Sequence, residues 1–395
     1  MQLMRQVGAV MMIAGALACG KDDGAAEGSS SEAGTTGAAA TSPTTTPVTS
    51  TGDPVSTETA TSDPGATTDA PTSTGPGTTD IATTDVSTTG QTTSETTDAT
   101  TDSSSTGESP VGPMVDVSDP KLWEFQFKAD DADAAATLAL GTQQAQLDTT
   151  VTPVGKLVVY LHGAGAPETC GSGAHGRELA RMGFHVMQPC YVSDYGVNNC
   201  GDDIGGCRLE AFEGVDHHAF IEITPPDSIE TRVVKGLEYV QAMHPGGDWQ
   251  YFIVDGKPRW SEIIISGISH GASSSGVVGM ARAVDRAVML SGPLDSDQAW
   301  LKGVPLTPID RFYGFTHTGD DQHMGHLKSF GDMMLPGQPV VVDGAAPPYD
   351  GSHRLVSSAP TGDGHGSTQA GGASPKDPQD AYLFLPVWRT MYGVE

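Results

Sequence analysis

The sequence predicts an α/β domain with a mostly parallel central sheet that is covered by helices on both faces. Two observations support this fold class. Short, continuous apolar runs, such as "KLVVYLHG" (156–163) and "SEIIISG" (261–267), are typical of strands buried on both faces. Between them lie amphipathic stretches with helical periodicity, such as 175–183 and 227–245. Alternation of the two patterns is typical of parallel strands joined by helices.

The expected elements follow one another along the chain. We expect strands at 156–163, 184–191, 261–267, 286–293, 311–318 and 353–360, and helices at 175–183, 227–245, 273–284, 323–335 and 381–393. Globular composition begins near Pro113, so one domain is expected over residues 113–395, a length that suits a single α/β domain. In such domains ligands collect at the carboxyl ends of the strands.

The residues before this domain have the composition of an export signal and a tether. The apolar run from Val7 to Ala18 is too short to span a membrane and ends in small residues, which predicts a signal peptide over residues 1–18. From Asp22 to Gly112 the chain has no lysine, arginine or aromatic residue. Such a segment cannot bury enough apolar surface to fold, so residues 19–112 are predicted to be a disordered, acidic, Thr/Ser-rich stalk.

The string "GALAC", which ends at Cys19, resembles a bacterial lipoprotein signal, in which the cysteine becomes the lipidated first residue of the mature chain. The match departs from the usual pattern by having Ala16 where leucine is preferred. The resemblance implies an exported protein that is lipid-anchored at the outer membrane or cell surface, with the anchor as its membrane contact. Plain secretion is the alternative.

Charge and cysteine content narrow the partners further. The formal net charge is -29, and no cluster of lysine and arginine is present, which argues against a nucleic-acid partner. Export favours disulfides among Cys170, Cys190, Cys200 and Cys207, for which three connectivities are possible. We favour Cys200 with Cys207 and Cys170 with Cys190. A zinc site is the alternative, but the spacings lack a C-x-x-C knuckle.

A candidate nucleophile lies in "IIISGISHGASSSG", residues 263–276. With 50 glycines in 395 residues, a Gly-x-Ser-x-Gly string alone is weak evidence. Here, however, the string follows a buried strand directly and opens into a helix, which is the context of a nucleophile elbow. Gly267 and Gly271 leave room for a tight turn, and the helix start places amide groups near a developing anion. Ser269 is therefore the predicted nucleophile.

The sequence resembles the α/β-hydrolase superfamily from about Lys156 onward. In "VVYLHGAGAPE", a glycine-rich turn follows a buried strand, as in the HG-rich oxyanion loop of many esterases and lipases. The resemblance implies that the oxyanion is bound by an amide of Gly163, Ala164 or Gly165, together with the amide of His270. Ala164 stands where HGGG-type loops have glycine, so the resemblance leaves the donor in this loop open.

An acid and a histidine follow in the family's chain order of Ser, Asp, His. After the expected strand at 311–318 comes "GDDQH", which offers Asp320 and Asp321 as the acid, with a narrow preference for Asp320. After the strand at 353–360 comes "TGDGHGS", which offers His365 as the base. His353 is a rival, but it precedes a strand instead of following one.

These residues predict a serine hydrolase that cleaves carboxylic esters through an acyl-enzyme, with no cofactor. The substrate could be a small molecule or a polymer, since esterases on polyester or feruloyl-type substrates, lipases and peptidases share this layout. One alternative is a non-catalytic surface binding module on the same scaffold. Another is a metal-dependent hydrolase that uses the cluster "HTGDDQHMGH", His317 to His326.

Overall fold

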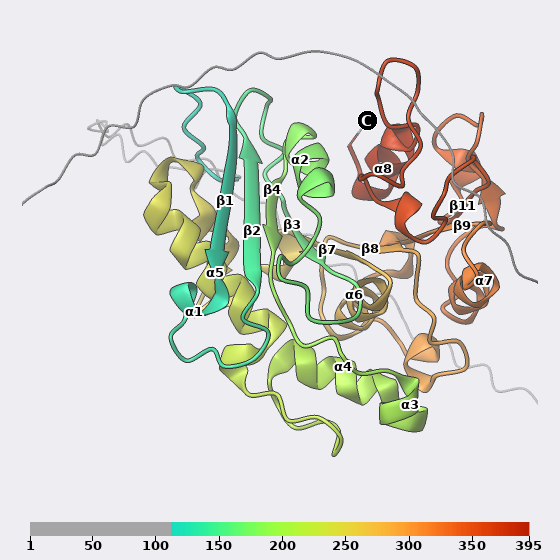
Figure 1. Ribbon diagram of the computed structural model, residues 1–395, viewed down its shortest axis with the longest axis horizontal. Helices are drawn as coiled ribbons and strands as arrows, with labels where there is room; N and C mark the ends of the chain where they lie inside the picture. Colours follow the sequence, from blue (N-terminus) through green and yellow to red (C-terminus); the bar gives the residue numbers. More distant parts are fainter. Residues whose placement is uncertain (1–111, 395) are drawn as a thin grey trace, which may run out of the picture. The chain divides into compact units, whose positions relative to one another are not determined.

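The structure is a computed structural model that describes residues 112–394 (Figure 1). The predicted signal peptide, the predicted lipidation site Cys19 and the predicted stalk up to residue 111 lie outside the described residues, so they stay predictions.

A nine-stranded sheet forms the centre of the domain, in the order β1-β2-β4-β3-β7-β8-β9-β11-β10. Its strands are β1 Leu122–Lys128, β2 Thr142–Asp148, β3 Leu157–Leu161, β4 His185–Gln188, β7 Ile263–Ile268, β8 Arg286–Leu290, β9 Phe312–His317, β10 Val340–Val341 and β11 Arg354–Ser357. The β1–β2 and β2–β4 pairs are antiparallel, and the six other pairs are parallel. A separate hairpin joins β5 Ile253–Val254 to β6 Lys257–Pro258.

Helices cover both faces of this sheet. They are α1 Ala129–Ala132, α2 Gly173–Arg181, α3 Val197–Cys200, α4 Ile204–Glu213, α5 Ile229–Met243, α6 His270–Ala281, α7 His323–Asp332 and α8 Leu385–Tyr392. Side chains of α4, α5, α6 and α7 belong to one buried apolar cluster, whereas those of α2 and α8 belong to the other. The predicted fold class is confirmed: a mostly parallel central sheet has helices on both of its faces.

The central strands show why their sequences are continuously apolar. In β3, Leu157 and Val159 pack into the cluster beneath α5 and α6, whereas Val158 and Tyr160 pack into the cluster beneath α2 and α8. Successive side chains of a strand point to opposite faces, so a strand with a core on each side needs apolar residues at every position. The same alternation holds for β7.

The first two strands were not predicted, and their sequences explain the omission. β2 reads TQQAQLD, yet Gln143, Gln144 and Gln146 are all buried. The side-chain amide of Gln144 donates to the Cys170 carbonyl at 2.7 Å, and the side-chain oxygen of Gln146 accepts from the side-chain amide of Gln188 at 2.9 Å. Hydrogen bonds to distant parts of the chain thus replace the apolar contacts that mark a buried strand.

Three connections leave the same edge of the sheet. β8 pairs in parallel with both β7 and β9, and β9 pairs in parallel with β11, so the carboxyl ends of these strands lie at one edge of the sheet. Ser269 follows β7, Asp320 follows β9, and His365 follows β11. The fold therefore brings together three side chains that are far apart in the sequence.

Candidate active site

Ser269 lies in a sharp turn between β7 and α6. Its backbone has φ 58° and ψ -120°, a conformation that costs energy for a residue with a Cβ. The Ser269 amide donates to the Leu290 carbonyl at 2.9 Å, which ties the turn to the end of β8. Helix α6 begins at His270, three residues earlier than predicted, so the helix starts directly behind the serine. This geometry matches the predicted nucleophile elbow.

The two glycines of the motif are required by close backbone contacts. A Cβ on Gly267 would lie 2.6 Å from the Gly271 backbone and 2.6 Å from the Leu161 carbonyl oxygen. A Cβ on Gly271 would lie 2.2 Å from that same oxygen. The turn therefore packs against the end of β3 so tightly that no side chain fits at either position.

The structure brings the predicted base and one of the two candidate acids together. His365 Nδ1 lies 2.7 Å from Asp320 Oδ2, and the Asp320 side chain is only 3% exposed. The other Asp320 oxygen accepts from the Gln322 amide at 2.9 Å. Asp321 is exposed to solvent. Of the two candidates, Asp320 is therefore the one that contacts His365, and it does so through Nδ1 and not through Nε2.

Ser269 and His365 are linked through the loop that follows β8. The Ser291 hydroxyl donates to the His365 carbonyl at 2.7 Å and contacts the Thr368 hydroxyl at 2.9 Å. Ser291 directly follows Leu290, the residue that accepts from Ser269. Within residues 112–394 no hydrogen bond joins Ser269 Oγ to His365. Catalytic hydrogen bonds are often long before substrate binds, so the separation is compatible with the predicted roles.

Buried polar contacts fix the rest of the histidine loop from several elements. The Tyr160 hydroxyl, on β3, donates to the Gln369 side chain at 2.5 Å. His175, on α2, accepts from the Ala370 amide at 3.1 Å. Trp388, on α8, donates to the Thr368 carbonyl at 2.8 Å. The loop has little regular structure of its own, so these contacts determine where His365 lies.

The predicted oxyanion loop packs against the serine. A Cβ on Gly163 would lie 3.5 Å from Ser269 Cβ and 4.0 Å from its Oγ. The Gly165 amide already donates to the Ser193 carbonyl at 3.2 Å, which makes Gly165 the poorest donor candidate of the three. The His270 amide is the first of helix α6 and so has no acceptor within the helix. Gly163 or Ala164, with His270, remains the predicted donor pair.

The His270 side chain is buried next to two tyrosines. Its Nδ1 lies 3.1 Å from the Tyr191 hydroxyl, and its ring packs edge-on against Tyr195 with centroids 4.7 Å apart. Burial, reinforced by the nearby Arg208 charge, lowers the pKa of His270 well below its ordinary value. The ring is therefore neutral at pH 7, and the backbone amide is the part of this residue that can serve catalysis.

A pocket of about 190 Å³ adjoins Ser269, and the segment between β4 and α5 forms one of its walls. Tyr195, Ile204 and Arg208 contribute from this segment, and Leu294 lines the pocket from the connection after β8. The segment contains helices α3 and α4, which pack with Trp300 into a small apolar cluster.

A buried ion pair closes this wall and was not predicted. Arg208 Nε and Nη2 donate to the two carboxylate oxygens of Asp295 at 2.8 and 3.0 Å, and Arg208 Nη1 contacts the His270 carbonyl at 3.3 Å. Both side chains are less than 5% exposed. Nothing in the local sequence indicates that residues 87 positions apart would meet.

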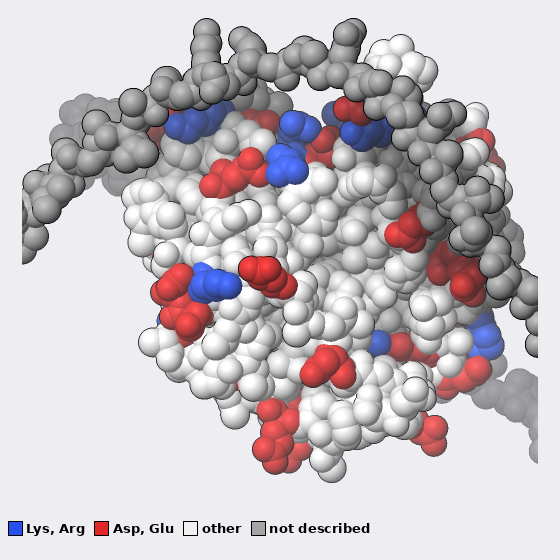
Figure 2. Space-filling model, viewed as in Figure 1, with Lys and Arg blue, Asp and Glu red and all other residues white. Residues whose placement is uncertain are grey.

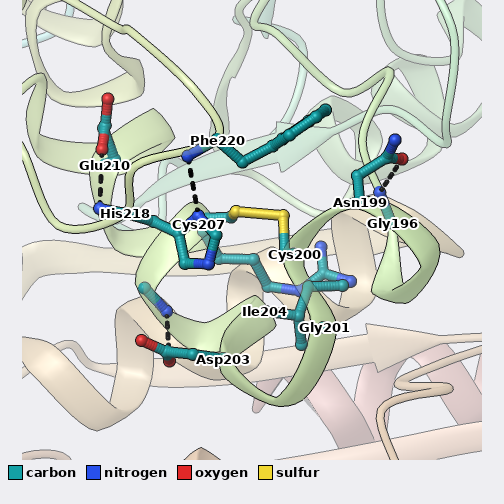
Figure 3. The surroundings of a disulfide bond; sticks show 12 residues. Gly196, Asn199, Cys200, Gly201, Asp203, Ile204, Cys207, Glu210, His218 and Phe220 are labelled. Atoms are coloured by element: carbon teal, nitrogen blue, oxygen red, sulfur yellow. Dashed lines mark hydrogen bonds between the residues drawn. A yellow bond between two sulfur atoms is a disulfide. The ribbon is translucent and has the colours of Figure 1, made fainter.

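The carboxylate of Glu210 binds three amides of the chain between α4 and α5, and Figure 3 shows one of these bonds, to His218. Glu210, which is buried, accepts from the amides of His217, His218 and Ile223, each at 3.0 Å. Residues 214–224 contain no helix or strand. The conformation of their backbone therefore depends on hydrogen bonds to one side chain on α4.

Both predicted disulfides are present. Cys170 is joined to Cys190, and Cys200 to Cys207. The first connects the segment before α2 to the end of β4. The second, drawn in Figure 3, joins α3 to α4, and both of these helices line the Ser269 pocket. The alternative of a zinc site at these cysteines is therefore wrong, because their sulfurs are bonded to each other.

The histidine cluster from His317 to His326 does not assemble as a unit. Both ring nitrogens of His317 bond backbone groups, the Ala359 carbonyl at 2.8 Å and the Gly319 amide at 2.9 Å. Asp320, His326 and His365 instead place their ligand atoms within 4.8 Å of one another. The rival base His353 stacks on Tyr313 and bonds the Phe312 carbonyl at 2.8 Å, at the opposite edge of the sheet.

The surface of the domain mixes charges of both signs. On the face drawn in Figure 2, acidic side chains lie among the lysines and arginines, which form no single continuous patch there. Within residues 112–394, none of the helices combines the length and the apolar character needed to cross a membrane.

Comparisons with known proteins find similar solved structures at low sequence identity. An S-formylglutathione hydrolase from Agrobacterium tumefaciens is 12% identical, with a TM-score of 0.33 over 55% of this chain and 83% of that chain. An S-formylglutathione hydrolase from Staphylococcus aureus is also 12% identical, with a TM-score of 0.32 over 55% of this chain and 87% of that chain. The fluorophosphonate-binding serine hydrolase F of Staphylococcus aureus is 14% identical, with a TM-score of 0.29 over 55% of this chain and 89% of that chain. No protein-family model matches the sequence, and no curated protein sequence does.

Proposed function

We propose that this protein is a serine hydrolase that cleaves carboxylic esters, with Ser269 as nucleophile, His365 as general base and Asp320 as the acid that orients it. One observation carries the proposal. A serine in a strained turn lies at the same edge of the sheet as a histidine whose Nδ1 is 2.7 Å from a buried carboxylate. A strained, non-glycine turn and a buried carboxylate each cost free energy, so their coincidence at one edge favours a catalytic role.

The reaction follows from these positions. Ser269 Oγ attacks the ester carbonyl carbon while His365 Nε2 takes the hydroxyl proton, and the imidazolium that forms is stabilised by Asp320. The His270 amide and an amide of Gly163 or Ala164 bind the oxyanion. The bond to the leaving alcohol then breaks, and His365 returns the proton to that alcohol. Water, deprotonated by His365, attacks the acyl-serine and releases the carboxylic acid.

The experiment that tests this function is covalent labelling with a fluorophosphonate probe, which reacts with activated serines. We expect label on Ser269, located by peptide mapping, which disappears in Ser269→Ala and slows strongly in His365→Ala. Ser261→Ala, an exposed serine just before β7, is the matched control and should label like the unaltered protein. A folded domain that takes up no label would overturn the proposal and favour the non-catalytic binding module.

The metal-dependent alternative makes an opposite prediction in the same assay. Labelling of a serine nucleophile needs no metal ion, so treatment with EDTA should leave both the labelling rate and ester turnover unchanged. Loss of turnover with EDTA, restored by Zn²⁺, would instead assign the reaction to Asp320, His326 and His365 as metal ligands.

We also propose that the protein is exported and lipid-anchored through Cys19. The sequence "GALAC" and the acidic stalk support this location, and so does the presence of two disulfides, which persist in oxidising compartments. Metabolic labelling with an alkyne-bearing fatty acid in the producing bacterium tests the anchor. Label is expected on the intact protein and not on a Cys19→Ala variant. An unlabelled protein that is released into the medium would support plain secretion.

A further inference from the structure

A second pocket, with a volume of about 830 Å³, lies at the edge of the sheet opposite Ser269. Arg286 and Tyr313 line it from the amino ends of β8 and β9, whereas Ser269 follows the carboxyl end of the neighbouring parallel strand β7. Pro347 and Leu385 contribute apolar walls. The pocket is therefore separate from the proposed active site and plays no part in the reaction proposed above.

The Arg286 guanidinium is held in place by packing against two residues. Its central carbon lies 5.5 Å from the centre of the Tyr313 ring, and that ring is itself stacked on His353 with centroids 3.9 Å apart. The guanidinium also lies close to Gly393, where a Cβ would be 2.6 Å from Arg286 Nε. The side chain therefore has a defined position before any ligand arrives, which lowers the entropy cost of binding one.

Arg286 differs from three other arginines of this domain in having no ion pair with an acidic residue between 112 and 394. Arg208, Arg232 and Arg282 each form an ion pair with an aspartate or glutamate. Arg286 has neither a hydrogen bond nor an ion pair with any residue between 112 and 394. Among residues 112–394, the lining of this pocket contains no acidic residue.

We propose that this pocket binds an organic carboxylate with an apolar body. A guanidinium presents a planar fork of N–H groups that matches the two oxygens of a carboxylate, and the fork of Arg286 has no partner within the described domain. The proline and leucine walls would cover the apolar part of the ligand. Because the net charge of -29 repels anions at long range, recognition depends on these local contacts.

Calorimetric titration of the full chain tests the proposal with 2-naphthoate and its neutral counterpart 2-naphthalenemethanol. We expect the carboxylate to bind at least tenfold more tightly than the alcohol. Arg286→Met should weaken carboxylate binding at least tenfold and leave alcohol binding unchanged. Arg181→Met, which removes an exposed arginine on α2, is the matched control and should bind both compounds like the unaltered protein.

A second variant guards against misfolding and locates the ligand. Thr390→Trp keeps Arg286 but fills the pocket from α8, so it should abolish binding of both compounds while the melting temperature stays within a few degrees. Equal affinity for acid and alcohol would overturn the proposal, because the guanidinium would then contribute nothing. Unchanged carboxylate binding in Arg286→Met or in Thr390→Trp would place the ligand elsewhere and overturn it as well.

Discussion

Asp320 and His365 lie 45 residues apart in the sequence, yet Oδ2 of the first is 2.7 Å from Nδ1 of the second. The contact depends on the parallel pairing of β9 with β11, which brings the connections after both strands to one edge of the sheet. Asp321 follows Asp320 directly but is exposed to solvent. Substitution of these two adjacent aspartates is therefore expected to have very different effects on activity.

Asp320→Asn should lower kcat/KM for a p-nitrophenyl ester by roughly 10³- to 10⁴-fold, because the amide cannot stabilise the imidazolium of His365. Asp321→Asn, the matched control, should change it less than about twofold, as expected of a surface substitution. Steady-state kinetics of both purified variants checks the prediction. Comparable losses in the two variants would contradict the assignment of the acid.

Ser291 should act as a positioning residue for His365. Removing its hydroxyl frees the His365 carbonyl, so we expect kcat to fall on the order of tenfold with KM nearly unchanged, since a small misplacement of the base slows chemistry. Ser291 has φ 44°, so Ser291→Gly and Ser291→Ala differ in backbone strain but both lack the hydroxyl. Similar kcat values in both would assign the effect to the hydroxyl. Full activity of Ser291→Gly would assign it to the backbone.

The buried pair of Arg208 and Asp295 should be costly to break from one side. Arg208→Met leaves a buried carboxylate without its partner, and we expect the free energy of unfolding to fall by about 3 to 5 kcal/mol. Replacing both residues, Arg208→Met with Asp295→Leu, should restore most of that loss, because no buried charge then remains. Urea unfolding measures each step. A double variant less stable than Arg208→Met would show that the pair is itself strongly stabilising.

Acid should destabilise the domain through its buried histidines. Burial lowers the pKa of His175 to about 3, and that of His162, His185 and His326 to about 4, from an ordinary value of 6.5. The folded chain then binds fewer protons than the unfolded chain between these values, so stability is fully present above about pH 6.5 and is lost as the pH falls towards 4. Each histidine contributes up to about 1.4 kcal/mol per pH unit. Equal urea midpoints at pH 7 and pH 5 would contradict this.

The sequence was sufficient for the parts of the fold that repeat a simple pattern. The strands β3, β7, β8 and β9 are buried on both faces, so their apolar runs identify them without reference to the rest of the chain. Helix α5 was predicted from a different pattern, because its apolar residues recur with helical periodicity along one face. The turn at Ser269 was predictable because it lies directly between a strand and a helix.

Other features depend on partners that are distant in the sequence. The glutamines of β2 look like surface residues until Cys170 and Gln188 supply their hydrogen bonds. Asp320 could not be separated from Asp321, because the choice depends on which of them turns towards His365. The Arg208–Asp295 pair joins two connections whose local sequences contain no sign of each other. Tertiary context, which no local pattern encodes, determined all three.

The three amides bound to Glu210 have a consequence for anyone who would redesign or transplant this domain. Residues 214–224 take their shape from a side chain on α4, so they carry little instruction for their own conformation. A graft that moves this stretch into another scaffold without α4 should lose the shape, whereas one that moves residues 204–224 together should keep it. The smallest exchangeable unit of this surface is thus larger than the loop seen by eye, and Glu210 marks its inner boundary.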